Sequence, residues 1–317
     1  MTAIERDIVA LAGGVGGAKL AHGLALTSLG EYLSVIVNTA DDFELFGLHI
    51  SPDLDTVLYT LAGIANPQTG WGITGDTFAT LDAIKRYGRD AWFWLGDQDF
   101  ATHILRTEQL RSGKSLTDVT DEFAQALGIE AHILPMSDEP VATLIETADG
   151  LLDFQSYFVR RQHADDVLGV TFADIEAARP TTEIIQALER ATAIVLCPSN
   201  PIVSIGPILA LPGIADWLRD TTIPIVAVSP IIGGQALKGP ADRMLASLGH
   251  EVSAVGVAMI YRDFLSGIVI DNADAALAER IEDLGIAVQV TDTIMRDDAY
   301  RTRLAEETLA FAEGLRR

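Results

Sequence analysis

A glycine-rich stretch near the N-terminus, Leu11–Leu20 with the sequence LAGGVGGAKL, decides which fold the chain can adopt. It closes an apolar run that begins at Ile8, a pattern typical of a buried strand that passes directly into a helix. Backbone N–H groups at such a helix N-terminus, together with the helix dipole, can hold an anion. Bulky side chains would block that approach, and the positions free of them are Gly13, Gly14, Gly16 and Gly17. The stretch therefore predicts a phosphate-binding loop.

The glycine stretch departs from both common phosphate-binding fingerprints. Lys19 stands where the G-x-G-x-x-G pattern has its last glycine, and neither Ser nor Thr follows Lys19 as a Walker loop requires. An atypical nucleotide or phosphoester site is therefore favoured over a plain dinucleotide site. The alternative that stays open is a tight strand-to-helix turn whose glycines serve packing alone.

The composition is that of an ordinary globular protein with a large core. The chain has 317 residues, of which 49% are hydrophobic and 21% charged, so it can form one large domain or two closely joined ones. It contains no run of about 18 apolar residues and no signal-peptide pattern, which predicts a cytoplasmic protein that does not enter a membrane. Its single cysteine, Cys197, lies in an apolar run and excludes an internal disulfide.

The net charge of −23 argues against nucleic acid or an anionic membrane surface as a partner, because both require a basic face. A phosphorylated ligand would need local charge compensation, which a divalent metal on carboxylates can supply together with N–H-rich loops. We therefore expect Mg²⁺ as a cofactor. Two of the four lysines, Lys19 and Lys238, lie in glycine-rich loops, where composition alone does not explain them.

Short apolar runs alternate with helical patterns along the chain. This βαβ signature predicts an α/β fold with a doubly wound, mostly parallel, Rossmann-like sheet. Strands are expected at residues 7–12, 33–38, 91–95, 131–135, 192–197, 223–229, 252–257 and 266–270. Helices are expected at residues 17–28, 53–63, 76–87, 100–112, 117–127, 183–191, 240–249, 273–284 and 294–315.

One stretch breaks this alternation. The runs 143–146 and 151–159 flank an Asp149-Gly150 pair, which is typical of the turn in an antiparallel hairpin. We therefore expect a smaller insertion or subdomain that contains this hairpin. The expected division of the chain is a Rossmann-like core of residues 1–140 and 183–317, and an insertion of residues 141–182.

The residues that follow the expected strands are the candidates for a site, because ligands bind beyond the carboxyl ends of strands in an open parallel sheet. Small, acidic or hydrogen-bonding residues follow five of the strands: Gly13–Lys19, Asn38–Asp42, Gly96–Asp99, Pro198–Pro201 and Pro230–Gly234. Turn chemistry alone rarely gives carboxylates and glycines at every strand end. We predict one shared ligand site at this edge of the sheet.

Two closely spaced acidic pairs follow the second expected strand: Asp41, Asp42, Asp53 and Asp55. Mg²⁺ usually takes one or two carboxylates together with ligand phosphates and waters, so one acid from each pair would be a sufficient set. Asp53 could instead cap the helix that begins near it. The same competing interpretation applies to Asp97 and Asp99, which precede another expected helix.

Two loops in the second half of the chain suit phosphate or ribose groups. Ser199 and Asn200 offer a hydroxyl and an amide in a turn stiffened by proline. A second glycine-rich loop provides further candidate ligands: Gly233, Gly234 and Lys238. Together with the first loop and Asn38, they predict a ligand that carries several phosphate or ribose groups.

Aromatic residues could wall a flat ligand if the fold brings them together. Gln155, Tyr157 and Arg160 of the hairpin region, with Trp92 and Trp94, are the candidates. Packing in the core explains them equally well, and the sequence leaves both interpretations open.

Several sequence blocks, in their order and spacing, resemble the phospholactate transferase family of deazaflavin coenzyme F-420 biosynthesis. The resemblance covers nearly the whole chain, and the blocks that carry it are GGVGGAKL, NTADD, SPDLDTVLYTLAG, WGITGDTF, LGDQDFATHILR, LPMSDEPVAT, SNPIVSIGPIL and SPIIGGQALKGPA. It implies a fold similar to that of Rossmann-type nucleotide binders, and a homodimer.

The resemblance also implies a reaction. A guanylyl-activated phospho-acid, phospholactate or phosphoenolpyruvate, would give its phosphoryl unit to the 5′-hydroxyl of the deazaflavin Fo and release GMP. Positioning and charge neutralisation suffice for such a transfer, without a covalent nucleophile. Mapped by motif, metal or the ribityl chain of Fo would be held by Asp41, Asp42, Asp53 and Asp55. The guanylyl diphosphate would be held by Gly13 to Lys19, Ser199, Asn200 and the loop from Gly233 to Lys238.

Some points stay open at the level of sequence. Asp41 or Asp55 could take the proton of the hydroxyl, because both belong to the acidic turn. A nucleotide-sugar-binding regulator of the same superfamily is the main alternative, and the DLDT and LGDQDFATH blocks speak against it. An NAD-dependent oxidoreductase is a weaker alternative. No residue chooses among lactate, enolpyruvate and glycerate as the donor acid.

Overall fold

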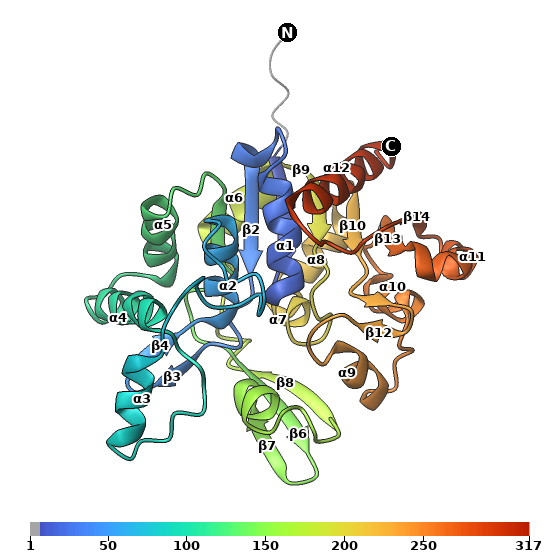
Figure 1. The fold of residues 1–317 in the computed structure, drawn as a ribbon. Helices are drawn as coiled ribbons and strands as arrows, with labels where there is room; N and C mark the ends of the chain where they lie inside the picture. The colour runs from blue at the N-terminus through green and yellow to red at the C-terminus, as the bar shows by residue number, and fades with distance from the viewer. Residues whose placement is uncertain (1–6, 317) are drawn as a thin grey trace.

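The computed structural model describes residues 7–316, and its centre is a seven-stranded sheet (Figure 1). All strand pairs in this sheet are parallel, in the spatial order β14-β13-β10-β9-β1-β2-β5. Because β1 lies between β2 and β9, the chain builds the sheet first to one side and then to the other, which confirms the doubly wound α/β fold. The bounds are β1 (Asp7–Ala12), β2 (Leu33–Val37), β5 (His132–Pro135), β9 (Ala191–Leu196), β10 (Ile225–Val228), β13 (Gly267–Asp271) and β14 (Ala287–Thr291).

Helices cover both faces of the sheet, so its strands are apolar on both sides. In β1, for example, Ile8 and Ala10 pack in one core cluster whereas Val9 and Leu11 pack in the other. The cluster of Ile8 includes residues of α1 (Gly14–Ala25), α2 (Pro52–Leu61), α5 (Leu116–Ala126) and α12 (Asp298–Gly314). The cluster of Val9 includes residues of α6 (Thr182–Arg190), α7 (Ile205–Ala210), α8 (Ile214–Asp220), α9 (Ala241–Ser247), α10 (Ala254–Tyr261) and α11 (Ala278–Glu282).

Two expected strands are wrong. Residues 91–95 form an irregular segment between α3 (Ala79–Arg86) and α4 (Asp97–Arg111), so only four of the five loops noted above follow strands. Residues 252–257 lie mostly in α10, which begins after Ser253, whose hydroxyl accepts the N–H of Gly256. Both runs are short and apolar, and periodicity cannot separate a buried strand from a buried helix at that length.

Other differences concern the C-terminal third of the chain. The helix expected at 273–284 is a 3₁₀ turn, Asn272–Leu277, followed by the short α11. Strand β14, which pairs with β13 at the edge of the sheet, was not predicted. Its residues are half-buried and less uniformly apolar than those of the inner strands, so the continuous apolar run that marks a buried parallel strand is missing.

The antiparallel hairpin is confirmed. Strand β6 (Ala142–Thr147) pairs with β7 (Gly150–Asp153), and β8 (Gly169–Ala173) pairs with the other edge of β6. The second strand ends at Asp153 rather than 159, because the chain turns into a short helical segment, Ser156–Arg160. Two further hairpins were not predicted: β3 (Phe43–Leu45) with β4 (Leu48–Ile50), and β11 (Ile231–Ile232) with β12 (Gln235–Ala236).

The small elements surround one edge of the central sheet. Figure 1 shows the α3 and β3–β4 region, the green β6–β8 sheet and the orange α9 region at the lower side of the view, where the arrow of β2 points. This is the side of the carboxyl ends of the strands, where α/β proteins bind ligands. Within residues 7–316, none of the helices has the length and apolar character needed to cross a bilayer.

Candidate functional site

A large cavity, of about 600 Å³, lies at the carboxyl ends of the central strands. This volume falls in the range of small-molecule sites, roughly 300–1,000 Å³. The structure brings many of the predicted residues to its wall: Gly13, Gly14, Gly16, Lys19, Asp41, Asp53, Asp55, Ser199, Asn200 and Lys238. Predicted residues from several strand ends therefore meet in the wall of one cavity, and its use as a ligand site stays a prediction.

The remaining predicted residues do not line the cavity: Gly17, Asn38, Asp42, Gly233 and Gly234. Gly17 lies behind the wall, where a Cβ atom would come within 2.4 Å of the hydroxyl of Ser199. The N–H of Gly233 donates to the carboxylate of Asp274 (3.0 and 3.1 Å) and is not available to a ligand. Asn38 does not reach the cavity but donates hydrogen bonds to two acids that line it, Asp41 and Asp53.

The glycine loop is partly occupied by the protein itself. The N–H of Gly13 donates to the hydroxyl of Ser199 (3.1 Å), and the N–H of Gly14 donates to the carboxylate of Asp53 (2.8 Å). A Cβ atom at Gly16 would lie 2.2 Å from the carbonyl oxygen of Pro198. The glycines thus serve close packing, and the N–H groups of the following residues in the first turn of α1 lack partners within the helix. The packing interpretation therefore applies to Gly16 and Gly17, and the phosphate-binding interpretation stays a prediction for the first turn of α1.

A buried acidic pair lies beside the glycine loop. The amide nitrogen of Asn38 donates to Asp41 Oδ2 (3.1 Å) and to Asp53 Oδ2 (3.0 Å), which holds the two carboxylates close together. Burial is the main cause that raises the pKa of Asp53 to about 6, and burial together with the charge of Asp53 raises the pKa of Asp41 well above its usual value. Asp41 Oδ1 is buried without a hydrogen-bond partner.

The other two acids of the predicted set have different surroundings. Asp42 accepts hydrogen bonds from the ring of His49 (3.0 Å) and the hydroxyl of Ser51 (2.7 Å), away from the cavity wall. Burial raises the pKa of Asp42, and these hydrogen bonds oppose the rise. Asp55 lines the cavity, and the guanidinium of Arg106 donates to both of its carboxylate oxygens.

Helix α4 adds a cluster of which the sequence analysis considered only Asp99, with a helix cap as the competing interpretation. Asp99 and His103 line the cavity beside Asp55, and the ligand atoms of the three side chains lie within 4.8 Å of one another. The hydroxyl of Tyr59 donates to Asp99 Oδ1 (2.7 Å). Arg106 is 1% exposed and belongs to the same cluster through Asp55.

Two lysines bring positive charge to another part of the cavity. Lys19 Nζ lies 3.5 Å from the carbonyl oxygen of Met295, and Lys238 Nζ donates to the carbonyl of Thr69 (2.7 Å). Burial lowers the pKa of Lys19, and the nearby charge of Lys238 lowers it further. Helix α1 and the loop before α9, which are distant in sequence, therefore bring two of the four lysines of an acidic chain to one cavity.

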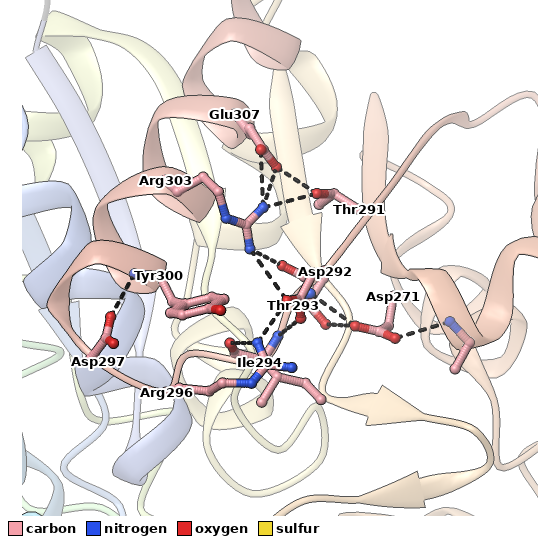
Figure 2. A network of polar contacts seen from close by, with 11 residues as sticks. Asp271, Thr291, Asp292, Thr293, Ile294, Arg296, Asp297, Tyr300, Arg303 and Glu307 are labelled. Atoms are coloured by element: carbon pink, nitrogen blue, oxygen red, sulfur yellow. Dashed lines mark hydrogen bonds and ion pairs between the residues drawn. The ribbon is translucent and has the colours of Figure 1, made fainter.

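The segment 293–295 forms part of the cavity wall, and Figure 2 shows the polar network that holds it. Asp271 Oδ2, at the end of β13, accepts hydrogen bonds from the backbone N–H (2.9 Å) and the hydroxyl (3.1 Å) of Thr293. On the other side, Arg303 of α12 donates to the carbonyl of Asp292. The network ties the segment that carries the Met295 carbonyl, which Lys19 contacts, to β13 and α12.

Aromatic side chains line the outer part of the cavity: Trp71, Phe93, Trp94, Phe154 and Phe158. Trp94 is 52% and Trp71 44% exposed, and Lys85 Nζ lies over the ring of Trp94, 5.0 Å from its centroid, so one face of that ring is covered. Of the residues considered from sequence, Gln155 lines the cavity and Tyr157 is buried in the core. Arg160 lies over the ring of Trp92, 5.6 Å from its centroid, outside the cavity wall.

Comparison with known proteins shows the family of the chain. Residues 8–306 match the family described as 2-phospho-L-lactate transferase CofD. The chain belongs to this family. A 2-phospho-L-lactate transferase of Methanosarcina mazei is 42% identical over 94% of this chain and 98% of its own length. A phosphoenolpyruvate transferase of Kitasatospora aureofaciens is 40% identical over 98% of each chain.

Solved structures show the same fold at lower sequence similarity. A crystal structure of a UPF0052 family protein from Bacillus halodurans superposes with a TM-score of 0.66 and 14% identity, over 96% of this chain and 98% of the other. This similarity supports the fold alone. As a member of the 2-phospho-L-lactate transferase family, the chain is a transferase, which removes the oxidoreductase alternative.

The α4 cluster contains two residues that the sequence analysis missed, His103 and Arg106, and one, Asp99, for which it left a site and a helix cap open. Asp99, His103 and Arg106 are spaced at i, i+4 and i+7 on α4, so they share one helix face. Asp55 and Tyr59 have the same i, i+4 relation on α2. These spacings were available in the sequence, and they mark polar residues on the face that each helix buries.

Proposed function

We propose that this member of the 2-phospho-L-lactate transferase family transfers a phospho-acid unit from a guanylyl-activated donor to the 5′-hydroxyl of the deazaflavin Fo. GMP is released, and the product is an intermediate of coenzyme F-420 biosynthesis. The observation that carries the proposal is one cavity with lysines in one part, a buried acidic group in another, and exposed aromatic faces at its outer part. The names of the relatives support transfer of phospholactyl or phosphoenolpyruvyl groups.

The guanylyl donor would occupy the part of the cavity with the glycine loop and the lysines. Unpaired N–H groups in the first turn of α1 suit a diphosphate. Lys19 and Lys238 offset the negative charge that the donor brings into an acidic protein. Ser199 and Asn200 line the same wall and add a hydroxyl and an amide.

The acidic pair Asp41 and Asp53 fits a divalent cation. Two carboxylates share one amide donor, and the buried Asp41 Oδ1 has no protein partner, which leaves an oxygen for a hard cation. We therefore propose Mg²⁺ at Asp41 and Asp53, with Asp55 on the same wall as a further candidate and Asp42 as a residue that supports the site from behind. When bound, Mg²⁺ would neutralise charge on the transferring phosphoryl group.

The aromatic wall suits the ring system of Fo. A flat deazaflavin can stack on the exposed faces of Trp71 or Trp94, and such contacts add to the area that the ligand buries. The ribityl chain would then reach inward toward the acids. This arrangement would bring the hydroxyl of Fo close to the activated phosphoryl group. Positioning of the reacting groups supplies most of the rate enhancement in phosphoryl transfer, together with charge stabilisation.

The experiment is to incubate purified protein with Fo, Mg²⁺ and, in turn, the guanylyl-activated forms of lactate, enolpyruvate and glycerate. Mass spectrometry should detect GMP and a phosphodiester of Fo with at least one donor, and the preferred donor identifies the acid. No product with any donor, combined with no quenching of Fo fluorescence, would refute the proposal. Binding of a nucleotide sugar in that case would favour a regulatory protein instead. Light scattering of the same sample tests the expected homodimer.

A further inference from the structure

The transfer proposed above requires a proton acceptor, and the contacts in the cavity discriminate among its acids. A hydroxyl that attacks phosphorus loses its proton, so a nearby carboxylate needs an oxygen that is free to accept a hydrogen bond from it. Four aspartates line the cavity: Asp41, Asp53, Asp55 and Asp99. The inference below rests on the proposed function and assigns this task to one of them.

Three of the four aspartates are committed to other partners. Asp53 accepts from the N–H of Gly14 on one oxygen and from Asn38 on the other. Both oxygens of Asp55 accept from Arg106. Asp41 accepts from Asn38 on one oxygen, and its other oxygen is buried out of contact with solvent, where we propose the metal.

Asp99 differs from the other three. Its Oδ1 accepts the hydroxyl hydrogen of Tyr59 at 2.7 Å, whereas its Oδ2 accepts no hydrogen bond from the described residues. The Asp99 side chain is 10% exposed and lines the cavity. The oxygen without a partner therefore belongs to a buried carboxylate whose other oxygen is held by a hydrogen bond. Burial and the charges of Asp55 and Asp99 raise the pKa of Tyr59 well above its usual value, so Tyr59 stays a donor.

His103 also contacts Asp99, through its ring nitrogen Nε2. Arg106 Nη1 lies 3.4 Å from His103 Nδ1, and because a guanidinium can only donate, Nδ1 is the acceptor in this contact. The proton of the neutral ring therefore sits on Nε2, which lies 3.3 Å from Asp99 Oδ1 without forming a hydrogen bond to it in this structure. In this tautomer Nε2 has no lone pair for a metal. The spacing of Asp55, Asp99 and His103 resembles a metal site, but the Arg106 contact argues against that use.

The charge of the cluster selects a neutral ligand. Two carboxylates, Asp55 and Asp99, face one guanidinium, Arg106, so the group as a whole repels the anionic donor. A neutral hydroxyl that can donate a hydrogen bond suits it. The anionic donor belongs beside Lys19 and Lys238, and the hydroxyl acceptor belongs beside α4.

We propose that Asp99 Oδ2 accepts a hydrogen bond from the attacking hydroxyl and takes its proton as the reaction proceeds. The hydroxyl oxygen forms a bond to the phosphorus that carries the acid, and the bond from that phosphorus to the bridging oxygen breaks. GMP leaves with the electron pair of that bond, and the proton passes from the hydroxyl to Asp99 and then to solvent. Tyr59, through its hydrogen bond, and His103, through its contact at 3.3 Å, are positioning residues for Asp99 Oδ1.

The first test is Asp99→Asn, with Glu108→Gln as the matched control. Glu108 lies on the same helix, is exposed, and loses one negative charge in the same way. Loss of a general base predicts that kcat of D99N falls about 10²–10⁴-fold, whereas E108Q keeps its activity. The Kd of the guanylyl donor, measured without Fo, should stay unchanged in both variants. A kcat of D99N within about 3-fold of E108Q, or an equal loss of donor affinity, overturns the assignment.

Variants at the positioning residues test the same idea without removing the carboxylate. The amide nitrogen of Gln can take the place of His103 Nε2, whereas that of Asn falls near Nδ1. His103→Gln should therefore keep most of kcat, and His103→Asn and Tyr59→Phe should each lose about 10-fold, with KM for the donor unchanged. Equal losses in H103Q and H103N with equal losses of thermal stability would indicate a structural role only and would overturn the assignment.

These experiments separate the two levels of the proposal. If the wild-type protein forms no phosphodiester with any donor, the proposed function fails and the role of Asp99 fails with it. If the wild type forms the product and D99N forms it equally fast, the function stands and only Asp99 is excluded. If D99N does not fold, the comparison of H103Q with H103N decides the question.

Discussion

The acidic part and the lysine part of the cavity are built in different ways. The acids are buried and hydrogen-bonded to other side chains. Asn38 donates to both Asp41 and Asp53, and Arg106 donates to Asp55. The lysines come from helix α1 and from the loop before α9, and both contact backbone carbonyls. The first arrangement is fixed before a ligand arrives, whereas the second consists of cations whose bonds a ligand can replace.

This difference indicates how one cavity can bind two substrates, each in its own part of the cavity. A negative region admits a neutral hydroxyl or a cation, and a positive region admits an anion. Two anionic substrates could not share the cavity without repulsion, whereas one anion and one neutral polyol can. Each prediction below changes one of the two regions and asks whether the other is unaffected.

The largest effect is expected from Asp41→Asn. This change removes one carboxylate from the proposed metal site but keeps an oxygen for Asn38, so the fold should persist. Because a bound cation supplies several kcal/mol of charge stabilisation, turnover should fall at least about 10³-fold, equivalent to about 4 kcal/mol. Steady-state rates and binding of Mn²⁺ as a Mg²⁺ substitute measure both effects. The matched control is Glu44→Gln at an exposed position, and an active, metal-dependent D41N would exclude Asp41.

Arg106→Met should damage the acidic region through stability. Arg106 is 1% exposed, and its removal leaves Asp55 buried without its counter-ion, which costs about 3–5 kcal/mol. Urea unfolding measures the loss, and Arg86→Met, at an exposed position, is the control. The double variant R106M/D55N should recover part of the loss, because it also removes the stranded charge. No recovery in the double variant would show that packing of Arg106, and not the ion pair, matters most.

The pH dependence of stability should report on Asp53. Folding raises the pKa of Asp53 from 3.8 to about 6, so the folded state binds this proton more tightly than the unfolded state. The proton on Asp53 therefore stabilises the folded state fully below about pH 4. This stabilisation, about 3 kcal/mol, declines as the pH rises and is lost above about pH 6. Asp41, whose pKa is also raised, changes stability in the same direction.

Unfolding in urea with EDTA, at several values between pH 4 and 7, measures this effect against Asp53→Asn. The variant should lose much of the decline, so its stability relative to the wild type increases with pH. Added Mg²⁺ at pH 7 should stabilise the wild type more than D53N if the pair binds the cation. Parallel pH curves for the two proteins would show that Asp53 titrates normally in the folded state.

The two regions also differ in how far sequence alone could predict them. Gly13 to Lys19, Asp41 and Asp53 follow the first two strands, and the rule that ligands bind at the carboxyl ends of strands located them. The α4 cluster could be located only in part: Asp99 was a candidate because residues 91–95 were expected to form a strand, which they do not, and His103 and Arg106 lie further along α4 in a peripheral region. The pairing of Arg106 with Asp55 joins residues 51 positions apart, and nothing local in the sequence specifies that contact.

The smallest effect is expected in the lysine region, from Lys19→Met. A charge-assisted hydrogen bond to a phosphate contributes about 1.5–3 kcal/mol, so the Kd of the guanylyl donor should rise about 10- to 100-fold. Lys238, in the same part of the cavity, limits the loss because it still offsets the donor's charge. The control is Lys114→Met, because Lys114 pairs with Glu122 on the surface far from the cavity wall.

Calorimetry with the donor, and fluorescence with Fo, tests whether the two regions act independently. Since Lys19 contacts the carbonyl of Met295 and none of the four cavity acids, the Kd of Fo should not change in K19M. An equal loss of affinity for Fo and for the donor would mean that Lys19 shapes the whole cavity through the 293–295 segment. The separation into an anionic-donor part and a hydroxyl-acceptor part would then be wrong, because one cation would serve both substrates.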